Sequence, residues 1–318
     1  MNLLLSAEQQ DLRAAVRSFL SNVNPRDGYD PAVYGRMNGE LGLAGLVIPD
    51  EYGGAGGGIS DLSVVLVETG AALLPGPFLA TTLATLALLE CPDKELLSGI
   101  AEGRINAALA WEDRPLVLGG MEADVLILVT GEPSLVAVEG FGREPVETID
   151  ITRGMARVSL DGATTRVLGR PSDRVHDLAM VAIAAEQLGV LRESLAAIVS
   201  YAKVRVAFGR FIGSYQGVKH KLADMHCALE QAESLVRHAA WTADAAPDEL
   251  PLAAALAQAY VGRACFQAAK DSLLLHGGIG FTWEHDAHLY FKRAKSDEVL
   301  LGPPRLHRSR LAALLGLS

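Results

Sequence analysis

The sequence predicts a mainly α protein, with a helical N-terminal domain, a small middle β domain and a C-terminal bundle of the four-helix type. Half of its 318 residues are apolar and only 6% are aromatic, a composition typical of helices packed on helices. Apolar residues recur with a helical period at both ends of the chain. Between them lie short β-type runs bounded by Gly, Pro and Asp. We expect the three domains at residues 1–106, 107–170 and 171–318.

The N-terminal domain is expected to be helical. Ser6–Gln9 has the form of a capping box, and apolar residues follow it at helical spacing. The glycine-rich run 49–58 lacks the lysine and the spacing of a phosphate-binding loop, so we interpret it as a tight connection between helices. Further helices are expected at 59–74, 78–89 and 94–101, and Pro75-Gly76-Pro77 would end the first of them.

The character of the sequence changes near residue 107. Short runs rich in Val, Ile and Leu predict strands at 124–129, 135–138, 148–151, 156–160 and 164–168. From Asp177 onward the helical period returns. It predicts helices at 177–204, 215–244, 251–275, 285–296 and 304–315.

Bulk properties exclude several functions. The net charge of −10 argues against nucleic-acid binding, which needs a basic surface. No apolar stretch is long enough to span a bilayer. The first residues include Glu8 and Asp11 and lack the basic region of a signal peptide. The three cysteines show no metal-ligand spacing. We therefore expect a cytoplasmic protein that binds no metal, no nucleic acid and no membrane.

Two runs in the C-terminal half carry the functional signal. Leu275–Glu284 ends a long helical pattern in the glycine pair Gly277-Gly278, and glycines let a ligand approach the backbone. About seventy residues upstream lies Arg205–Arg210, followed by Gln216. Taken singly, these residues could also be a helix C-terminal cation, a core phenylalanine and a C-cap. A local basic cluster could serve nucleotide phosphates or form a solvated face (Lys203, Arg210, Lys219, Lys221).

Together with the order of the domains, these runs resemble the acyl-CoA dehydrogenase family over nearly the whole chain. The sequence is most similar to short, actinobacterial-type subunits of heteromeric enzymes that act on steroid-derived CoA thioesters. In the family, a glutamate takes the α-proton of the thioester and FAD takes the β-hydride. The resemblance implies that FAD is bound across a dimer interface by Arg205, Phe208, Gln216, Gly277 and Gly278. Arg205 would pair with the pyrophosphate and Phe208 would pack on the cofactor.

The sequence departs from the family at the catalytic base. The two positions that carry the base in family members align with Leu301 and Ala179, and neither side chain can take a proton. We therefore expect no catalytic residue in this chain. The flavin-binding run at the start of the β domain is also reduced, since Leu109–Pro115 lacks its glycine-serine part, and Leu274 replaces a usual glutamine.

These departures imply a subunit that completes an FAD site while a related, longer subunit supplies the base. The resemblance implies a heterotetramer, an acyl-CoA substrate and an electron-transfer flavoprotein as electron acceptor, with helices 215–244 and 251–275 at the interface. Two alternatives stay open, a self-sufficient subunit using a displaced carboxylate (Glu284 or Glu298) and a flavin-free binding module. A monooxygenase or oxidase on the same fold is a further one.

Overall fold

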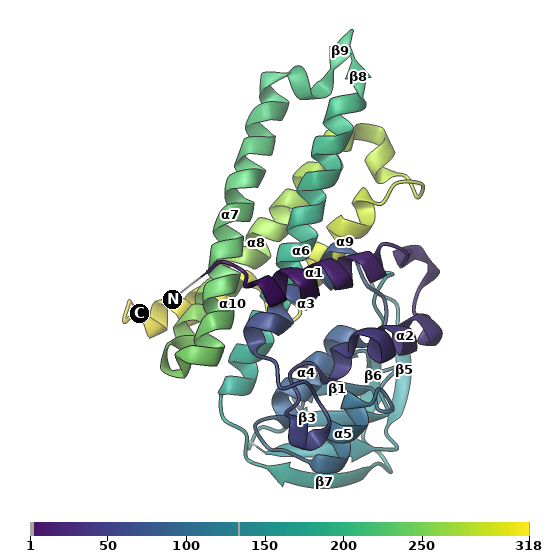
Figure 1. Cartoon of the computed structure of the whole chain (residues 1–318), viewed down its shortest axis with the longest axis vertical. Helices are drawn as coiled ribbons and strands as arrows, with labels where there is room; N and C mark the ends of the chain where they lie inside the picture. Colours follow the sequence, from purple (N-terminus) through teal and green to yellow (C-terminus); the bar gives the residue numbers. More distant parts are fainter. Residues whose placement is uncertain (1–2, 133, 318) are drawn as a thin grey trace.

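The computed structural model describes residues 3–132 and 134–317 and confirms the mainly α fold, with the three parts in the expected order (Figure 1). The first helix, α1 (Ala7–Leu20), begins at the predicted capping box. There the Gln9 amide donates to Ser6 Oγ at 3.1 Å, and the Ser6 amide donates to the Gln9 side chain. The other N-terminal helices are α2 (Pro31–Leu41), α3 (Ile59–Ala71), α4 (Phe78–Leu88) and α5 (Lys94–Ala101).

The glycine-rich run forms the predicted tight connection into α3. A short 3-10 turn, η3 (Asp50–Tyr52), opens it. Gly54 then lies so close to the preceding turn that a Cβ there would be 2.0 Å from the carbonyl oxygen of Ile48. Only glycine allows this approach, so the run serves chain reversal.

The β domain consists of two small sheets below the helices (Figure 1). One has the strand order β1-β3-β4-β7, in which β1 and β3 run parallel and the other pairs are antiparallel. The other has the order β2-β6-β5 and is antiparallel. The strands are β1 (Ala107–Trp111), β2 (Leu116–Leu118), β3 (Val125–Val129), β4 (Leu135–Glu139), β5 (Gly142–Val146), β6 (Met155–Ser159) and β7 (Thr164–Gly169).

The prediction of a strand at 148–151 is wrong. The chain forms β5 earlier, and residues 147–154 make the turn between β5 and β6. In this turn Ile149 and Ile151 are 55% and 53% exposed, whereas Asp150 and Thr152 are 1% and 2% exposed. The polar residues face inward because buried arginines meet them there, whereas a half-buried strand would place its apolar residues inward.

The C-terminal part confirms the predicted helices to within a few residues. They are α6 (Arg174–Val204), α7 (Gln216–Ala245), α8 (Leu250–His276), α9 (Ala287–Val299) and α10 (Pro304–Leu314). Helices α6, α7 and α8 run lengthwise in a bundle that projects beyond the β domain (Figure 1). Among the described residues, none of the helices combines the length and apolar character needed to cross a bilayer.

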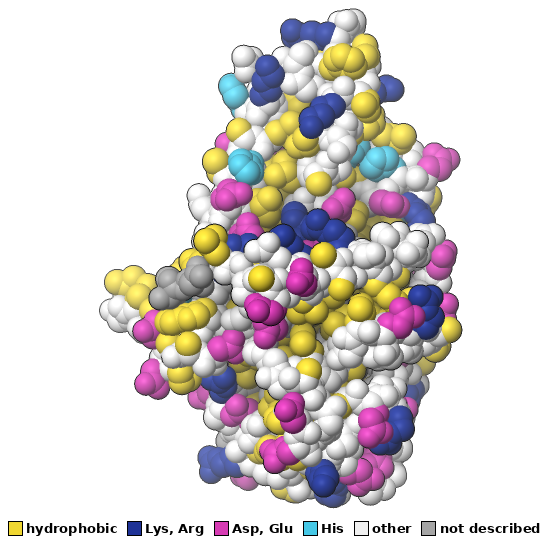
Figure 2. All heavy atoms as spheres, viewed as in Figure 1, with side chains coloured by type: hydrophobic (Ala, Val, Ile, Leu, Met, Phe, Trp, Pro, Cys, Tyr) yellow, Lys and Arg dark blue, Asp and Glu magenta, His cyan; other side chains and the backbone are white. Residues whose placement is uncertain are grey.

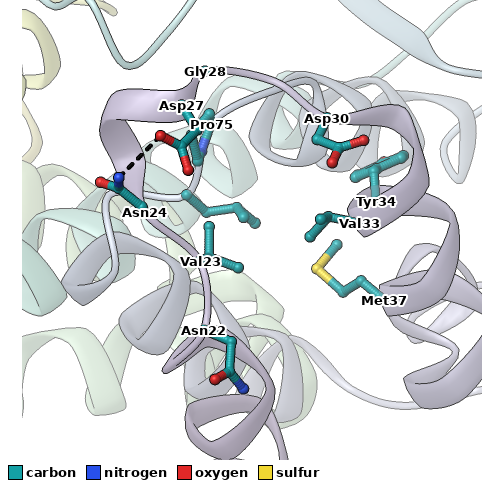
Figure 3. Close-up of a pocket in the computed structure, with 11 residues that line it drawn as sticks. Asn22, Val23, Asn24, Asp27, Gly28, Asp30, Val33, Tyr34, Met37 and Pro75 are labelled. Carbon is teal, nitrogen blue, oxygen red and sulfur yellow. Dashed lines mark hydrogen bonds between the residues drawn. The ribbon is translucent and has the colours of Figure 1, made fainter.

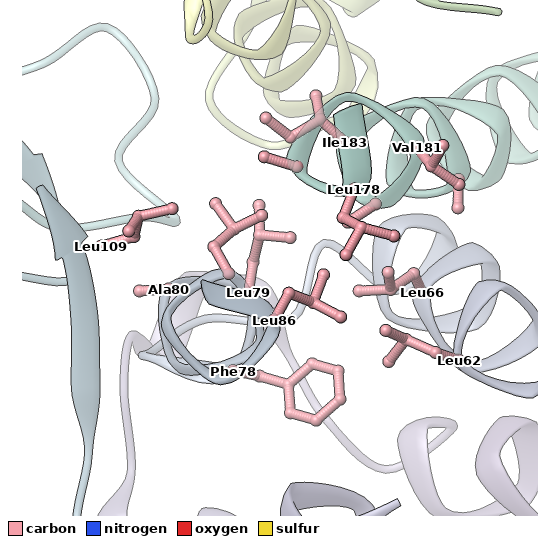
Figure 4. Packing of buried hydrophobic residues seen from close by; sticks show 14 of the residues in the cluster. Leu62, Leu66, Phe78, Leu79, Ala80, Leu86, Leu109, Leu178, Val181 and Ile183 are labelled. Atoms are coloured by element: carbon pink, nitrogen blue, oxygen red, sulfur yellow. The ribbon is translucent and has the colours of Figure 1, made fainter. Parts of the chain in front are cut away.

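The interior is filled by apolar side chains where the three parts meet. Helix α4 is buried along its whole length. It packs between β1, which contributes Leu109, and helices α3 and α6, which contribute Leu66 and Leu178 (Figure 4). Helices α3 and α6 approach closely at two glycines. A Cβ on Gly189 would lie 2.0 Å from the Val67 carbonyl oxygen, and one on Gly70 would lie 2.2 Å from that of Glu186.

Candidate functional site

One end of the bundle brings the two sequence motifs together. Helix α6 ends there, the hairpin of β8 (Val206–Ala207) and β9 (Arg210–Phe211) follows, and α7 begins. Helix α8 ends beside them, because the ring of Tyr201, one turn before Arg205, lies 4.7 Å from the ring of His276. The glycine pair follows His276 directly. We call the set Arg205, Phe208, Gln216, Gly277 and Gly278 the bundle edge.

Phe208 is held in an unusual backbone conformation at the tip of the β8–β9 hairpin. Its φ is +52° and that of Gly209 is +78°, so the two form a tight turn with positive φ at both positions. A bulky residue in this region of φ/ψ space is strained by about 1–3 kcal/mol. The side chain is nevertheless 97% exposed, so Phe208 is not a core residue. An aromatic ring held in water at such a cost indicates a surface that meets something outside the chain.

Arg205 and Gln216 frame this hairpin. Arg205 is the C-cap residue of α6, which agrees with the helix-terminal alternative. Its side chain is exposed and forms no ion pair with any residue that the structure describes. Gln216 is the exposed first residue of α7. The guanidinium therefore remains available to an external anion.

The predicted basic cluster is only partly free. Lys221 lies 3.3 Å from Asp271 in an ion pair, and the Arg210 guanidinium stacks 3.8 Å from the Tyr215 ring centroid. Lys203 and Lys219 are exposed. Lys221 and Arg210 therefore have partners within the chain, whereas Lys203 and Lys219 face solvent, as Arg205 does.

The two glycines have different reasons to be glycine. Gly277 caps α8 with φ +68°, a conformation that disfavours side chains. Gly278 has no positive φ, and a Cβ there would meet no described atom within 4 Å. None of the described residues would block a side chain at Gly278. The bare backbone is therefore open to a ligand.

Apolar side chains surround the bundle edge. Those that are exposed lie at the end of α6, on the hairpin, near the end of α8, in the following turn η6 (Gly277–Phe281) and just after it, namely Val204, Val206, Phe211, Leu274, Ile279, Phe281 and Trp283. Figure 2 shows hydrophobic and basic side chains side by side at this end of the molecule. Large exposed apolar patches on soluble folds mark interaction surfaces.

The two positions that the sequence predicts to align with the base lie in the core. Ala179 is 1% exposed and Leu301 is 3% exposed. Neighbouring ion pairs and hydrogen bonds close over both. Asp177 pairs with Arg310 at 2.6 Å, and Arg114 of the β domain donates to the Leu300 carbonyl at 3.5 Å. Neither position offers a carboxylate or access to a substrate.

Neither of the two alternative carboxylates, Glu284 and Glu298, has the surroundings expected of a catalytic base. Glu284 is exposed on the loop after η6. Glu298 is 8% exposed and pairs with Lys295 at 2.6 Å. A buried carboxylate with a lysine partner has a structural role sufficient to explain it.

A group of charged residues that the sequence did not reveal lies between the β domain and the bundle. Arg153 of the β5–β6 turn pairs with Glu186 on α6 and with Asp297 on α9, the latter at 2.5 Å. Arg293 on α9 pairs with Asp150 of the turn at 2.6 Å and with Glu186 at 3.4 Å. We call these five residues the buried ion network. The residues come from three distant segments, and only the charge of Glu186 within the apolar run of α6 could have hinted at them.

Electrostatics within the buried ion network are unbalanced, since two arginines face three carboxylates. Burial raises the pKa of Asp297 to about 7, with Arg153 acting against this and Glu186 reinforcing it. Burial also opposes ionisation of Asp150, but Arg293 and Arg153 hold its pKa below the usual value. Burial thus favours the neutral form more strongly at Asp297, whose pKa is raised, than at Asp150, whose pKa is lowered.

The described cavities do not offer an enclosed acyl site. The cavity in Figure 3, of about 80 Å³, lies between α2 and the preceding loop, where Asn24 donates to Asp27 at 3.0 Å. It is too small for a CoA thioester. A surface cleft of about 680 Å³ is lined by residues of α1, α3 and α6 and by Asp286 and Tyr290 at the start of α9. Its two arginines, Arg17 and Arg192, are both bonded to buried Glu68.

Comparisons with known proteins agree with this architecture. The acyl-CoA dehydrogenase N-terminal domain matches residues 6–97, and the C-terminal domain of the same family matches residues 177–316. Acyl-CoA dehydrogenase IpdE2 of Mycolicibacterium smegmatis is 40% identical over 307 residues, which cover 96% of this chain and 93% of that protein.

Two solved structures have the same fold. A variant of the Tcur3481–Tcur3483 steroid ACAD superposes with a TM-score of 0.87 at 26% identity, covering 97% of this chain and 98% of that one. A chain of the ChsE4–ChsE5 complex from Mycobacterium tuberculosis gives a TM-score of 0.86 at 23% identity and 100% coverage of both chains. The chain belongs to the acyl-CoA dehydrogenase family of oxidoreductases, whose cofactor is FAD.

Proposed function

We propose that this chain is the subunit of a heteromeric acyl-CoA dehydrogenase that completes an FAD site and leaves the catalytic base to a related, longer subunit. The assembly is a heterotetramer that introduces an α,β double bond into an acyl-CoA thioester. The solved relative described as a steroid ACAD supports a steroid-derived acyl group. We place the complex in the cytoplasm, with an electron-transfer flavoprotein as electron acceptor.

One contrast carries this proposal. The positions of the base are sealed in the core as Ala179 and Leu301, while Arg205 and Phe208 stand exposed. A self-sufficient enzyme would need the reverse arrangement, with an accessible carboxylate beside its substrate. The geometry therefore favours a chain that contributes to a site from outside.

The bundle edge fits a dinucleotide. The unpaired guanidinium of Arg205 suits the diphosphate because its planar fork donates two parallel hydrogen bonds. Phe208 offers a ring face, and Gly278 leaves the backbone open. When bound, FAD supplies the hydride acceptor. This chain's residues would hold and orient the cofactor, and its apolar rim would exclude water.

The predicted interface on α7 and α8 is supported by an open groove between these helices. Its volume is about 260 Å³, and it is lined by Met225, Ala228, Ala259 and Ala264, with charged residues at the rim. Small side chains on a groove permit close approach of another helix. We propose that a helix of the partner subunit lies there.

Co-expression with related subunits tests the function. We expect a yellow complex whose flavin bleaches anaerobically with CoA esters of steroid-derived acids, and a colourless, inactive chain when it is purified alone. Tight FAD binding and full turnover by the isolated chain would refute the heteromer. Colourless complexes with every related partner would favour the flavin-free module, and oxygen consumption without another acceptor would indicate an oxidase.

Substitution of the two displaced carboxylates separates the proposal from the self-sufficient alternative. We expect Glu284→Gln and Glu298→Gln to keep the turnover of the complex within about twofold, since neither is placed as a base. Glu298→Gln is expected to lower stability, because it leaves Lys295 without its partner. If either variant abolished flavin reduction while keeping the flavin colour, that residue would be the base. Stopped-flow flavin reduction provides the measurement.

A further inference from the structure

Charged residues of α6 and α9 lie close in sequence to the two positions expected to align with the base, Ala179 on α6 and Leu301 just after α9. Glu186 follows Ala179 by seven residues, which is two helical turns, so both lie on one face of α6. Arg293 precedes Asp297 by four residues, so both lie on one face of α9, and Leu301 follows Asp297 by four residues in the turn after the helix. The buried ion network therefore lies along the two surfaces that would border a reaction centre.

The β5–β6 turn provides the group that fills the space between these faces. Thr152 donates its hydroxyl hydrogen to Asp150 at 2.6 Å, which shapes the turn. Arg293 donates to both Asp150 and Thr152 at 2.6 Å. From the same turn Arg153 reaches both helices, through Glu186 and Asp297. Every side chain in this contact set is less than 10% exposed.

The sequence of the turn agrees with this role. Its apolar residues, Ile149 and Ile151, face solvent, whereas Asp150, Thr152 and Arg153 are buried. Exposing the two isoleucines to water is unfavourable. The arrangement is stable only because the buried charged side chains of the turn form ion pairs with residues on α6 and α9. A further β-domain residue, Arg114, donates to the Leu300 carbonyl just after α9.

We infer that the β5–β6 turn is an internal plug, held by the buried ion network, that fills this chain's own reaction cleft. Flavin or thioester held by an assembly then contacts this chain only from outside, at the bundle edge. The plug also fixes the β domain rigidly to α6 and α9. The cleft of this chain is thus closed by its own residues as well as lacking a base.

Hydrogen exchange on the isolated chain tests the plug without any flavin. The β6–β7 turn at 160–163, which is mostly exposed, is the matched control within the same β domain. We expect the amides of 147–154 to exchange at least about tenfold more slowly than those of 160–163. Equal, rapid exchange in both turns would overturn the plug.

A pair of arginine variants sharpens this test. Arg153→Ala is expected to raise the exchange of 147–154 by at least about tenfold. Arg166→Ala is the control, because Arg166 is 48% exposed and pairs with Asp93 at the surface of the β domain. Unchanged protection of the turn in Arg153→Ala would contradict the role of the network. If Arg153→Ala fails to fold, the comparison of exchange at 147–154 and 160–163 in the unmodified chain still tests the plug.

A second arm uses the flavin-loaded complex and therefore rests on the proposed function. Removing FAD from the complex should increase exchange in this chain at 205–216 and 277–283 and leave 147–154 and 179–186 unchanged. Flavin-dependent protection of 147–154 or 179–186 would show that this chain's own cleft is occupied and would overturn the plug. A complex that never contains FAD would instead defeat the proposed function and leave the result on the isolated chain intact.

Discussion

Arg205→Ala is expected to strip flavin from the assembled complex. The guanidinium is exposed and has no ion-pair partner among the described residues, so the substitution removes an external contact without disturbing the fold. A charge-assisted hydrogen bond is worth about 1.5–3 kcal/mol, which corresponds to roughly 10- to 100-fold weaker FAD binding. Flavin content after dialysis and FAD titration of the apo-complex measure the effect.

Two further variants control this result. Arg308→Ala removes another exposed arginine, on α10 and away from the bundle edge, and should leave flavin content unchanged. Arg205→Lys keeps the charge but loses the planar fork, so an intermediate affinity is expected. Arg205→Ala should alter the unfolding free energy of the isolated chain by no more than about 0.5 kcal/mol. Full flavin retention by the alanine variant would remove Arg205 from the site.

Gly189→Ala is expected to cause the largest loss of stability. The added Cβ would lie 2.0 Å from the Val67 carbonyl oxygen and 2.7 Å from the Ala71 amide nitrogen. These are backbone atoms of α3, so no side chain can move aside and the two helices must separate. Overpacking of this kind costs about 1–3 kcal/mol and sometimes more, and we expect at least the upper value here. Urea unfolding of the isolated chain measures it.

Gly217→Ala provides the opposite case for the same chemical change. Gly217 lies in the exposed first turn of α7, and a Cβ there would meet no described atom within 4 Å. The higher helix propensity of alanine should make this variant neutral or more stable by up to about 1 kcal/mol. Equal destabilisation by both substitutions would show that the α3–α6 crossing is not the cause.

Helices were predictable from the sequence because each carries its own signal. The capping box before α1, the glycine pair after α8 and the long apolar periods act within a few residues of the structure they determine. Local rules also identified the β domain. They failed at the β5–β6 turn, where Thr148–Ile151 looks like a strand but the partners of its polar residues lie on α6 and α9.

In the candidate site, too, some residues could be predicted from local sequence motifs and others could not. The exposed residues Arg205 and Phe208 came from contiguous motifs that resemble the family, and the structure adds the strained backbone and the lack of ion-pair partners. That Arg153 of the turn meets Glu186 and Asp297 could not be predicted, because such contacts depend on tertiary packing between segments over 30 residues apart.

The exposed rim around Phe208 also bears on how the cell must supply this polypeptide. A copy of the chain without a partner subunit exposes these apolar side chains to water. Exposed apolar surface is the feature that chaperones and proteases recognise. If the proposed heteromer forms, we expect surplus copies to aggregate or be degraded, so that synthesis would have to match that of the proposed partner subunit. A pulse-chase measurement of the chain's degradation rate, with and without the proposed partner subunit, would test this dependence.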